Sequence, residues 1–341
     1  MTNARGSNPI MADVARLAGV ALGTVSNAIN HPEKVTEATR ARISAAMAEL
    51  GFVQNSQARS LATGRSHTIG MVVTDLGNSF FVEIARGAEH EVQANGMTLL
   101  LANSDNALAK ENTYLDLFDQ GRFAGIIVAP FEAANHSLER MRKHGRPVVL
   151  VNVACSTDDG CSVVVDDEQG GYLATRHLIE LGRTRIAFVG GPDRLEPLLE
   201  RRLGVERAVA ETGGRVELEE IIVPAVNTPE GHAVGEAIVA REAARRPDAI
   251  VAASDLLALG MTQAFHGVIR VPEQIALIGY DNNSAASESR PPVSTIAQPG
   301  YAMGQAAAEL LGDEITNEAN HVHRSVRLEP TLVARESTVG R

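Results

Sequence analysis

Residues 10–30, IMADVARLAGVALGTVSNAIN, decide how the amino-terminal part of the chain folds. Apolar residues at helical spacing lie on both sides of Gly19, and this glycine suits the tight turn between two helices. Ala15 and Gly19 are small enough to let the two helices cross closely. The second helix has a short polar face, which is typical of a recognition helix lying in the major groove of DNA. A buried helical hairpin is the alternative interpretation of this pattern taken alone.

The next segment continues the helical pattern and then loses it. A third helical run extends from Thr36, a predicted N-cap, to about Leu50, and Gly51 is the predicted residue after its end. Residues 55–66, NSQARSLATGRS, are small and polar except for Leu61. Because helix nucleation is costly, this stretch cannot form a stable helix alone. We interpret it as a flexible linker, or as a segment that becomes helical only when something else holds it.

From His67 onward, short apolar runs alternate with longer amphipathic runs. This alternation predicts parallel sheets covered on both faces by helices, and its two series predict two α/β lobes with a cleft between them. Ligands of such sheets bind at the carboxyl ends of the strands. The expected strands cover 69–73, 97–101, 125–130, 147–151 and 162–167, then 185–191, 249–254 and 275–280, and the expected helices include 80–94, 168–181, 229–245 and 256–266.

Charge is distributed unevenly along the 341 residues, which carry a net charge of −11. Residues 1–65 hold seven basic and four acidic side chains, a net charge of +3, whereas the remainder holds 24 basic and 38 acidic ones, a net charge of −14. A basic head on an acidic body suits a unit that contacts phosphate joined to one that does not. The sequence has no long apolar run and no signal-peptide pattern, so we expect a cytoplasmic protein without a membrane partner.

Motifs of catalysis and cofactor binding are missing from the sequence. It contains no GxGxxG, Walker, GxSxG or HExxH motif, so we expect neither enzymatic activity nor a cofactor. Cys155 and Cys161 have no Cys or His at ligand spacing nearby, which argues against a metal or a disulfide. His321 and His323 form a weak two-ligand pattern that is expected to flank a strand instead.

The order of the motifs resembles the lactose/galactose-repressor (LacI) family, from Ile10 to about Ser337. The resemblance implies an all-α helix-turn-helix head with a hinge helix, followed by a two-lobed α/β body like that of the periplasmic binding proteins, with parallel sheets. It implies a sequence-specific DNA-binding transcriptional regulator. The motifs that carry it are DVARLAGV and TVSNAIN within 13–30, VTEATRARI at 35–43, ARSLATGRS at 58–66, ATRHLIELGR at 174–183, ASDLLALG at 253–260, and IGYDN with TIAQP within 278–299.

The resemblance also sets the expected domain boundaries. Residues 1–54 form the helix-turn-helix domain, 55–66 the hinge helix and linker, and 67–341 the effector-binding and dimerisation domain. Within the last of these, we expect lobe one to span about 67–162 and 295–320, and lobe two about 163–294 and 321–341.

By position in the family, three residues of the second helix read base edges and three contact phosphates. The base-reading residues are Leu22, Gly23 and Asn27, and the phosphate-contacting residues are Thr24, Ser26 and Asn30. The family pattern is broken at Ala21, which offers no side-chain N-cap, and at Asn27, which replaces a frequent Arg. An amide pairs with adenine whereas Arg prefers guanine, so the operator half-site should differ from common family sequences. The alternative interpretation is that Asn27 is a solvent-exposed helix residue that does not read a base.

The hinge is expected in the minor groove at the operator centre. Leu61 matches the family's wedging leucine, and an apolar wedge is what unstacking a base step requires. Packing of Leu61 on Phe52 is the alternative, and Gln54 replaces the family's proline ahead of this helix. The residues carried over for this contact are Asn55, Ala58, Arg59, Leu61 and Ala62.

Five residues of the body are expected to bind a small-molecule effector. Phe80 and Phe81 follow the first strand, where an aromatic face can cover a sugar ring or stack on a base. Asn152, Arg201 and Asp281 match family positions that hydrogen-bond the effector, and the last two suit a polyol. The alternative for Arg201 and Asp281 is a salt bridge that closes the lobes. The side chains of Asp105 and Asp255 are two further carboxylates that could face the cleft. Asp255 could equally be the N-cap of the helix at 256–266.

The sequence therefore predicts a homodimeric repressor of a carbohydrate-use operon. It would bind a palindromic double-stranded operator DNA and be released by a sugar or sugar phosphate. One alternative keeps this architecture with a purine or nucleoside as co-repressor. A more remote alternative is a simple sugar-binding protein, against which the basic helical head argues.

Overall fold

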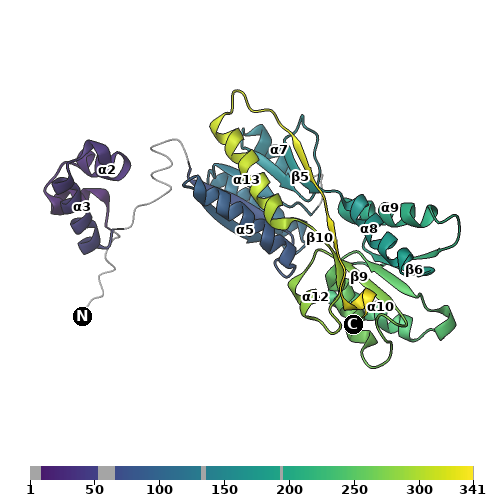
Figure 1. The fold of residues 1–341 in the computed structure, drawn as a ribbon. Coiled ribbons are helices and arrows are strands. Elements are labelled where there is room, and N and C mark those ends of the chain that lie inside the picture. The colour runs from purple at the N-terminus through teal and green to yellow at the C-terminus, as the bar shows by residue number, and fades with distance from the viewer. Residues whose placement is uncertain (1–8, 53–65, 132–135, 193–194, 341) are drawn as a thin grey trace. The chain divides into compact units, whose positions relative to one another are not determined.

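The computed structural model describes residues 9–52, 66–131, 136–192 and 195–340. The chain divides into two units, Met1–Ser66 and His67–Arg341, drawn in Figure 1. The positions predicted for the hinge, residues 55, 58, 59, 61 and 62, lie outside the described residues.

The first unit consists of short helices packed on a small apolar core. Gly19 ends α1 with a φ of 63°, so the tight turn predicted there is present. Thr36 caps α3 by accepting the N–H of Thr39, and Gly51 ends α3 with a φ of 62°. Ala21 provides no side-chain cap for α2. The elements are α1 (Met11–Ala18), α2 (Leu22–Asn30), η1 (Pro32–Lys34) and α3 (Glu37–Leu50), and the buried core comprises Val14, Ala15, Ala18, Val25, Ile43 and Ala46.

The second unit contains two six-stranded sheets, one in each lobe. The first sheet is wholly parallel, in the order β11-β5-β4-β3-β1-β2. The second has the order β12-β10-β9-β8-β6-β7 and is parallel except for β12. The strands are β1 (Thr68–Val73), β2 (Thr98–Asn103), β3 (Gly125–Val128), β4 (Val148–Val151), β5 (Cys161–Val165), β6 (Arg185–Gly190), β7 (Glu217–Ile222), β8 (Ala249–Ala252), β9 (Ala276–Tyr280), β10 (Ser294–Ala297), β11 (Ser325–Leu328) and β12 (Thr331–Val333).

Helices cover both faces of each sheet because successive strand residues point to opposite faces. In β1, Met71 and Val73 belong to one core cluster and Val72 to the cluster on the other face. Lobe one carries α5 (Ser79–Ala94), α6 (Leu108–Gln120), α7 (His136–Lys143) and α13 (Gly300–Thr316). Lobe two carries α8 (Asp167–Glu180), α9 (Glu196–Ala210), α10 (Thr228–Val239), η2 (Ala243–Arg245), α11 (Asp255–Phe265), α12 (Ser284–Glu288) and α14 (Glu336–Val339).

The segments that join the lobes differ from the boundaries predicted from the sequence. Val163–Val165 complete β5 in the first sheet, β10 belongs to the second sheet, and β11 returns to the first. The chain therefore crosses between lobes at 165–167, 297–300 and 328–331 in the described part. A strand has the same sequence pattern whichever sheet it joins, so hydrophobic periodicity does not reveal the lobe to which it belongs. In the described ranges, no helix is long and apolar enough to cross a membrane.

Candidate functional site

The residues predicted to contact DNA lie on α2 of the first unit. Leu22, Gly23 and Asn27 are exposed, whereas Val25 on the opposite side of the helix is fully buried in the core. Thr24 and Ser26 are half-buried, and Asn30 is the last residue of the helix. Leu22 leaves 53% of its surface exposed, and a Cβ at Gly23 would meet no atom within 4 Å. The predicted base-reading residues are thus open to a partner.

A cavity of about 380 Å³ lies between the two lobes of the second unit. It lies at the carboxyl ends of strands from both sheets, the place where open parallel sheets bind ligands. All five predicted effector residues line it: Phe80 and Phe81 from the first turn of α5, Asn152 after β4, Arg201 in α9, and Asp281 after β9. The fold therefore brings together residues that are up to 201 positions apart in the sequence.

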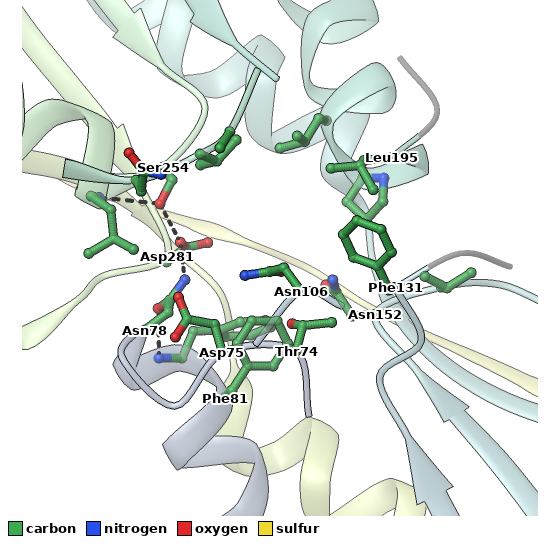
Figure 2. A pocket seen from close by; sticks show the side chains of 18 of the residues that line it. Thr74, Asp75, Asn78, Phe81, Asn106, Phe131, Asn152, Leu195, Ser254 and Asp281 are labelled. Carbon is green, nitrogen blue, oxygen red and sulfur yellow. Dashed lines mark hydrogen bonds between the residues drawn. The ribbon is translucent and has the colours of Figure 1, made fainter. Parts of the chain in front are cut away.

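Two ends of the cavity differ in chemistry (Figure 2). Asp281 and Ser254 lie at one end, and Phe131, Asn152 and Leu195 lie at the other. Apolar residues are contributed by both lobes. They are Phe80, Phe81, Pro130, Phe131, Val153, Leu195, Pro197, Leu198, Pro224, Ala225, Val226 and Leu256.

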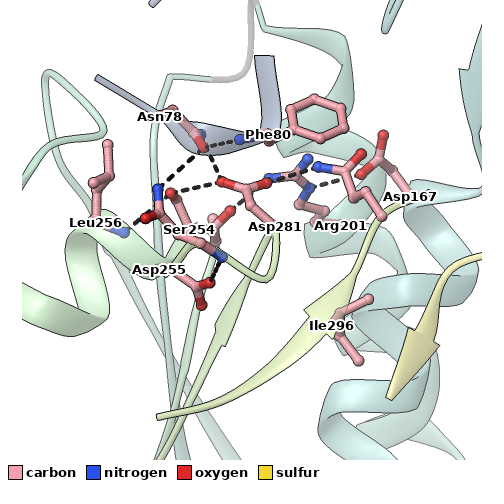
Figure 3. A network of polar contacts seen from close by, with 12 residues as sticks. Asn78, Phe80, Asp167, Arg201, Ser254, Asp255, Leu256, Asp281 and Ile296 are labelled. Carbon is pink, nitrogen blue, oxygen red and sulfur yellow. Dashed lines mark hydrogen bonds and ion pairs between the residues drawn. The ribbon is translucent and has the colours of Figure 1, made fainter. Parts of the chain in front are cut away.

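Asp281 is the centre of the polar network at the first end (Figure 3). Its carboxylate accepts hydrogen bonds from Nδ2 of Asn78 at 2.8 Å, Oγ of Ser254 at 3.0 Å and Nε2 of Gln298 at 2.7 Å. Its φ of 102° is one that side-chain-bearing residues rarely adopt. Burial raises the pKa of Asp281 above its ordinary value, although Arg201 and the three donors act in the opposite direction. The carboxylate is therefore held in one orientation toward the cavity.

Arg201 is buried, and its guanidinium already has partners in lobe two. Nε donates to Asp167 at 2.7 Å, and an Nη atom donates to the carbonyl oxygen of Ala253 at 2.6 Å. The guanidinium lies 3.7 Å from the centre of the Tyr280 ring and 3.7 Å from a carboxylate oxygen of Asp281. These partners all belong to lobe two, so the Arg201–Asp281 pair does not close the lobes as the alternative interpretation proposed. A contact between the lobes is made instead by Asn78 of lobe one, which donates to Asp281.

Asp255 and Asp105 do not line the cavity. Ser254 caps α11 by accepting the N–H of Leu256, and Asp255 is the first residue of that helix instead of its cap. Asp255 is fully buried and accepts the N–H of Asn283 at 2.6 Å. Burial, reinforced by the carboxylate of Asp281, raises the pKa of Asp255 well above its ordinary value. Asp105 is exposed and pairs with Lys110.

The cavity also contains polar residues that were not predicted from the sequence. Asn78 is the N-cap of α5, and its Oδ1 accepts the N–H of Phe80 at 3.0 Å. Gln298 lies in a segment that joins the lobes. The position of these residues just after β1 and β10 was the available signal, because the carboxyl ends of parallel strands meet at one edge. The other unpredicted polar residues of the lining are Thr74, Asp75, Asn106, Glu196, Asn227 and Ser254.

A three-helix unit with an exposed recognition helix, followed by a two-lobed body with a cavity at the strand ends, defines a DNA-binding regulator with a small-molecule site. Residues 10–55 match the model of the bacterial regulatory proteins of the lacI family, and residues 175–338 match the periplasmic binding protein-like domain. The chain belongs to the lacI family, whose members are transcriptional regulators and not enzymes.

Relatives of known name or structure match nearly the whole chain. The HTH-type transcriptional repressor PurR of Aliivibrio fischeri (strain MJ11) is 34% identical over 331 residues, 96% of this chain and 98% of that protein. The transcriptional regulator CelR in its cellobiose complex has a TM-score of 0.72 and 29% identity, covering 96% of this chain and 99% of that one. The lac repressor dimer bound to operator and the anti-inducer ONPF has a TM-score of 0.82 and 24% identity, covering 97% and 99%, and supports the fold alone.

Proposed function

We propose that this regulator is a cytoplasmic, homodimeric repressor of a carbohydrate-use operon, and that a small neutral sugar in the cavity releases it from a palindromic operator. One observation carries the choice of ligand. Oδ1 of Asn152 and Oε1 of Gln298 line the cavity, are buried, and accept no hydrogen bond from the described residues. Buried acceptors normally have donors, so a ligand rich in hydroxyl groups would satisfy them.

The charge of the lining supports a neutral sugar over a sugar phosphate. Among the described residues of the cavity, Asp75, Glu196 and Asp281 are acidic, whereas Arg201 is the single cation. Arg201 is already engaged by Asp167, Ala253 and Asp281. A phosphate group would therefore be buried beside carboxylates without a free cation, and an unpaired buried charge is costly. This narrows the ligand class expected from the sequence.

Aromatic rings supply the complementary apolar surface. Phe80 and Phe81 are largely buried, with ring centroids 5.1 Å apart and planes tilted by 57°. Such a site, mostly apolar with a few placed polar groups, is typical of small-molecule pockets. A purine or nucleoside acting as co-repressor is the second candidate, because a base can also stack on aromatic rings and bond to amide side chains.

Thermal unfolding of the full-length protein with panels of ligands tests the proposal. A neutral mono- or disaccharide at 100 times its Kd should stabilise the native state by about 2.7 kcal/mol, and the matching sugar phosphate should give no shift. A shift only with phosphorylated sugars would contradict the charge argument. A shift only with purine bases or nucleosides would replace the sugar by the second candidate.

The sign of the switch is tested with operator titrations in the presence and absence of the stabilising ligand. A 100-fold loss of operator affinity requires about 2.7 kcal/mol of coupling between the two sites. We expect such a loss, because residues 55–63 are proposed to fold only when two copies pair over the operator centre, and a ligand that rearranges the lobes separates them. Tighter operator binding with ligand would indicate co-repression and favour the purine alternative.

The role of Asp281 in the response is tested by Asp281→Asn. In the absence of effector, we expect this variant to bind operator as wild type does. It should lose the response to effector, because an amide NH2 group replaces a carboxylate oxygen that accepts hydrogen bonds inside the site. Asp105→Asn is the matched control, since Asp105 is exposed and does not line the cavity. An unchanged effector response in Asp281→Asn would exclude Asp281 from the effector site.

A further inference from the structure

A cluster of metal-ligating side chains lies in lobe one, outside the cavity. It consists of Cys161, the first residue of β5, Glu314 near the end of α13, and His321 in the segment that leads to β11. Their donor atoms all lie within 4.8 Å of one another. Sγ of Cys161 is 3.3 Å from Nε2 of His321, which in turn is 4.0 Å from Oε2 of Glu314. Residues 160 positions apart in the sequence thus form one compact donor set.

The surroundings orient these donors toward a common point. Nδ1 of His321 is 2.7 Å from Oδ2 of Asp313, so Nδ1 carries the proton and the lone pair of Nε2 faces the cluster. The backbone N–H of Arg324 donates to Sγ of Cys161 at 3.4 Å. Carboxylate–histidine pairs of this kind are typical second partners of metal ligands.

One oxygen of the cluster has no hydrogen-bond partner among the described residues. This atom is Oε2 of Glu314, and it is buried. A thiolate at Cys161 and a carboxylate at Glu314 would be two anions held close together. The side chain of His321 is only 3% exposed, and Cys161 is fully buried. A cation bound between them would stabilise both anions.

We propose that Cys161, Glu314 and His321 bind a zinc ion. Zinc favours sulfur and imidazole donors, and its tetrahedral bonds of about 2.0–2.3 Å place neighbouring donors roughly 3.3–3.8 Å apart. The Cys161–His321 distance of 3.3 Å already fits this spacing, and Glu314, 4.0 Å from His321, would move closer by a side-chain rotation. Binding transfers the thiol proton of Cys161 to solvent as the Zn–S bond forms.

His323 lies beside the donor set without belonging to it. Its Nε2 is 3.7 Å from Oε1 of Glu314, and its ring centre is 5.3 Å from that of His321. The fourth tetrahedral position would therefore be taken by water or, after a side-chain rotation, by His323. The ion would tie β5, the end of α13 and the segment before β11 together. Sequence reasoning missed this arrangement because the cysteine and the histidines meet only in the folded lobe.

Cobalt substitution in the full-length protein tests the proposal directly. Chelator-treated protein titrated with Co²⁺ should develop a thiolate-to-cobalt charge-transfer band together with visible bands of tetrahedral cobalt, and one equivalent of Zn²⁺ should abolish them. Zn²⁺ should also raise the melting temperature of the wild-type protein. Absence of these bands with wild-type protein, or no Zn²⁺ binding at micromolar concentration, would overturn the proposal.

The two cysteines provide a matched pair of variants. Cys161→Ser should lose the charge-transfer band, whereas Cys155→Ser should keep it, because Cys155 is not in the donor set. Glu314→Gln keeps the thiol and should weaken Zn²⁺ binding at least ten-fold, which preserves the test if Cys161→Ser does not fold. A charge-transfer band that persists in Cys161→Ser, or Zn²⁺ affinity unchanged in Glu314→Gln, would show that the metal binds elsewhere.

Discussion

Asn78 donates a 2.8 Å hydrogen bond from Nδ2 to Asp281 and thereby joins the first helix of lobe one to the loop after β9 in lobe two. The oxygen of the Asn78 side chain is also fixed. Its Oδ1 accepts a hydrogen bond from the N–H of Phe80 and a longer one, of 3.3 Å, from Nδ2 of Asn283. The bond from Asn283 also joins the lobes, and a third such bond runs from the N–H of Ser284 to Oγ of Ser79 at 3.2 Å. The two lobes are thus held together by a small set of polar contacts at one end of the cavity.

Asn78→Ala should lower the stability of the body by about 1.5–3 kcal/mol, since a hydrogen bond to a buried carboxylate is lost. It should also weaken binding of the effector, because the closed cleft loses one of its contacts. Urea unfolding and ligand titration measure the two effects. Gln93→Ala is the control on the same helix, where Gln93 is exposed and bonds only to Glu89. Equal stability of both variants would show that the bond between the lobes contributes nothing.

Asp255→Asn should change how stability depends on pH. The raised pKa of Asp255 means that the folded protein binds a proton more tightly than the unfolded chain. Stability from this group is therefore fully present below the ordinary aspartate pKa and is lost as the pH rises toward the folded pKa. The amide introduced at position 255 does not ionise, so the unfolding free energy of the variant lacks this decrease. The variant should therefore gain stability relative to wild type as the pH increases from 4. A difference in unfolding free energy that stays constant with pH would contradict it.

Arg201→Ala should destabilise the body by about 3–5 kcal/mol, because it leaves the buried carboxylate of Asp167 without its partner. Combining it with Asp167→Ala should recover part of the loss, since no lone buried charge remains. Arg176→Ala, which removes an exposed pair with Glu180, should cost at most about 1 kcal/mol. Additive losses in the double variant would show that Arg201 and Asp167 act independently.

Gly304→Ala and Gly312→Ala on α13 should have opposite effects. A Cβ at Gly304 would lie 1.9 Å from the carbonyl oxygen of Ile84, so α13 and α5 would have to separate. A Cβ at Gly312 would meet nothing within 4 Å, and alanine there should stabilise the helix by about 0.5–1 kcal/mol. Melting temperatures of the two variants provide the comparison. A stable Gly304→Ala protein would show that this helix contact can relax.

Asn27→Ala should relax specificity at one base pair of each operator half-site, at a cost of about 1–3 kcal/mol. Arg59→Ala should weaken binding to all sequences and reduce the slope of affinity against salt concentration, as expected for a phosphate contact. Binding to a library of operator variants at two salt concentrations distinguishes the two effects. An unchanged preferred operator with Asn27→Ala would show that another residue of α2 reads that base.

The strands that were predicted correctly are continuous apolar runs, and apart from the exposed edge strand β2 they are mostly buried. β1, β4 and β8 are continuous apolar runs and need no context to be recognised. β7, with the sequence ELEEII, is an edge strand with one partner, and its charged residues hide it from a search for apolar runs. The short strands β10, β11 and β12, of three or four residues each, were missed as well. The helix expected at 229–245 ends at Val239.

The residues of the cavity also divide into those that the sequence predicted and those that only the folded structure brings together. Phe80 was predicted because it follows the first predicted strand, whereas Asn152 and Asp281 were predicted from the resemblance to the family. Gln298 was not, because a polar residue in a segment joining the lobes looks like any loop residue until the fold places it beside Asp281. The contact between Cys161 and His321 could not be predicted from the sequence at all. Its spacing of 160 residues is set by the return of β11 to the first sheet.

Opening of the cleft has a low energetic cost because of the way the chain crosses between lobes. No strand of the described sheets is shared, and the three crossings at 165–167, 297–300 and 328–331 are short. A hinge motion there changes a few backbone torsions and leaves every strand pair intact. Substitutions in the crossing at 328–331, whose residues do not line the cavity, should therefore shift the balance between open and closed lobes while leaving the cavity lining unchanged.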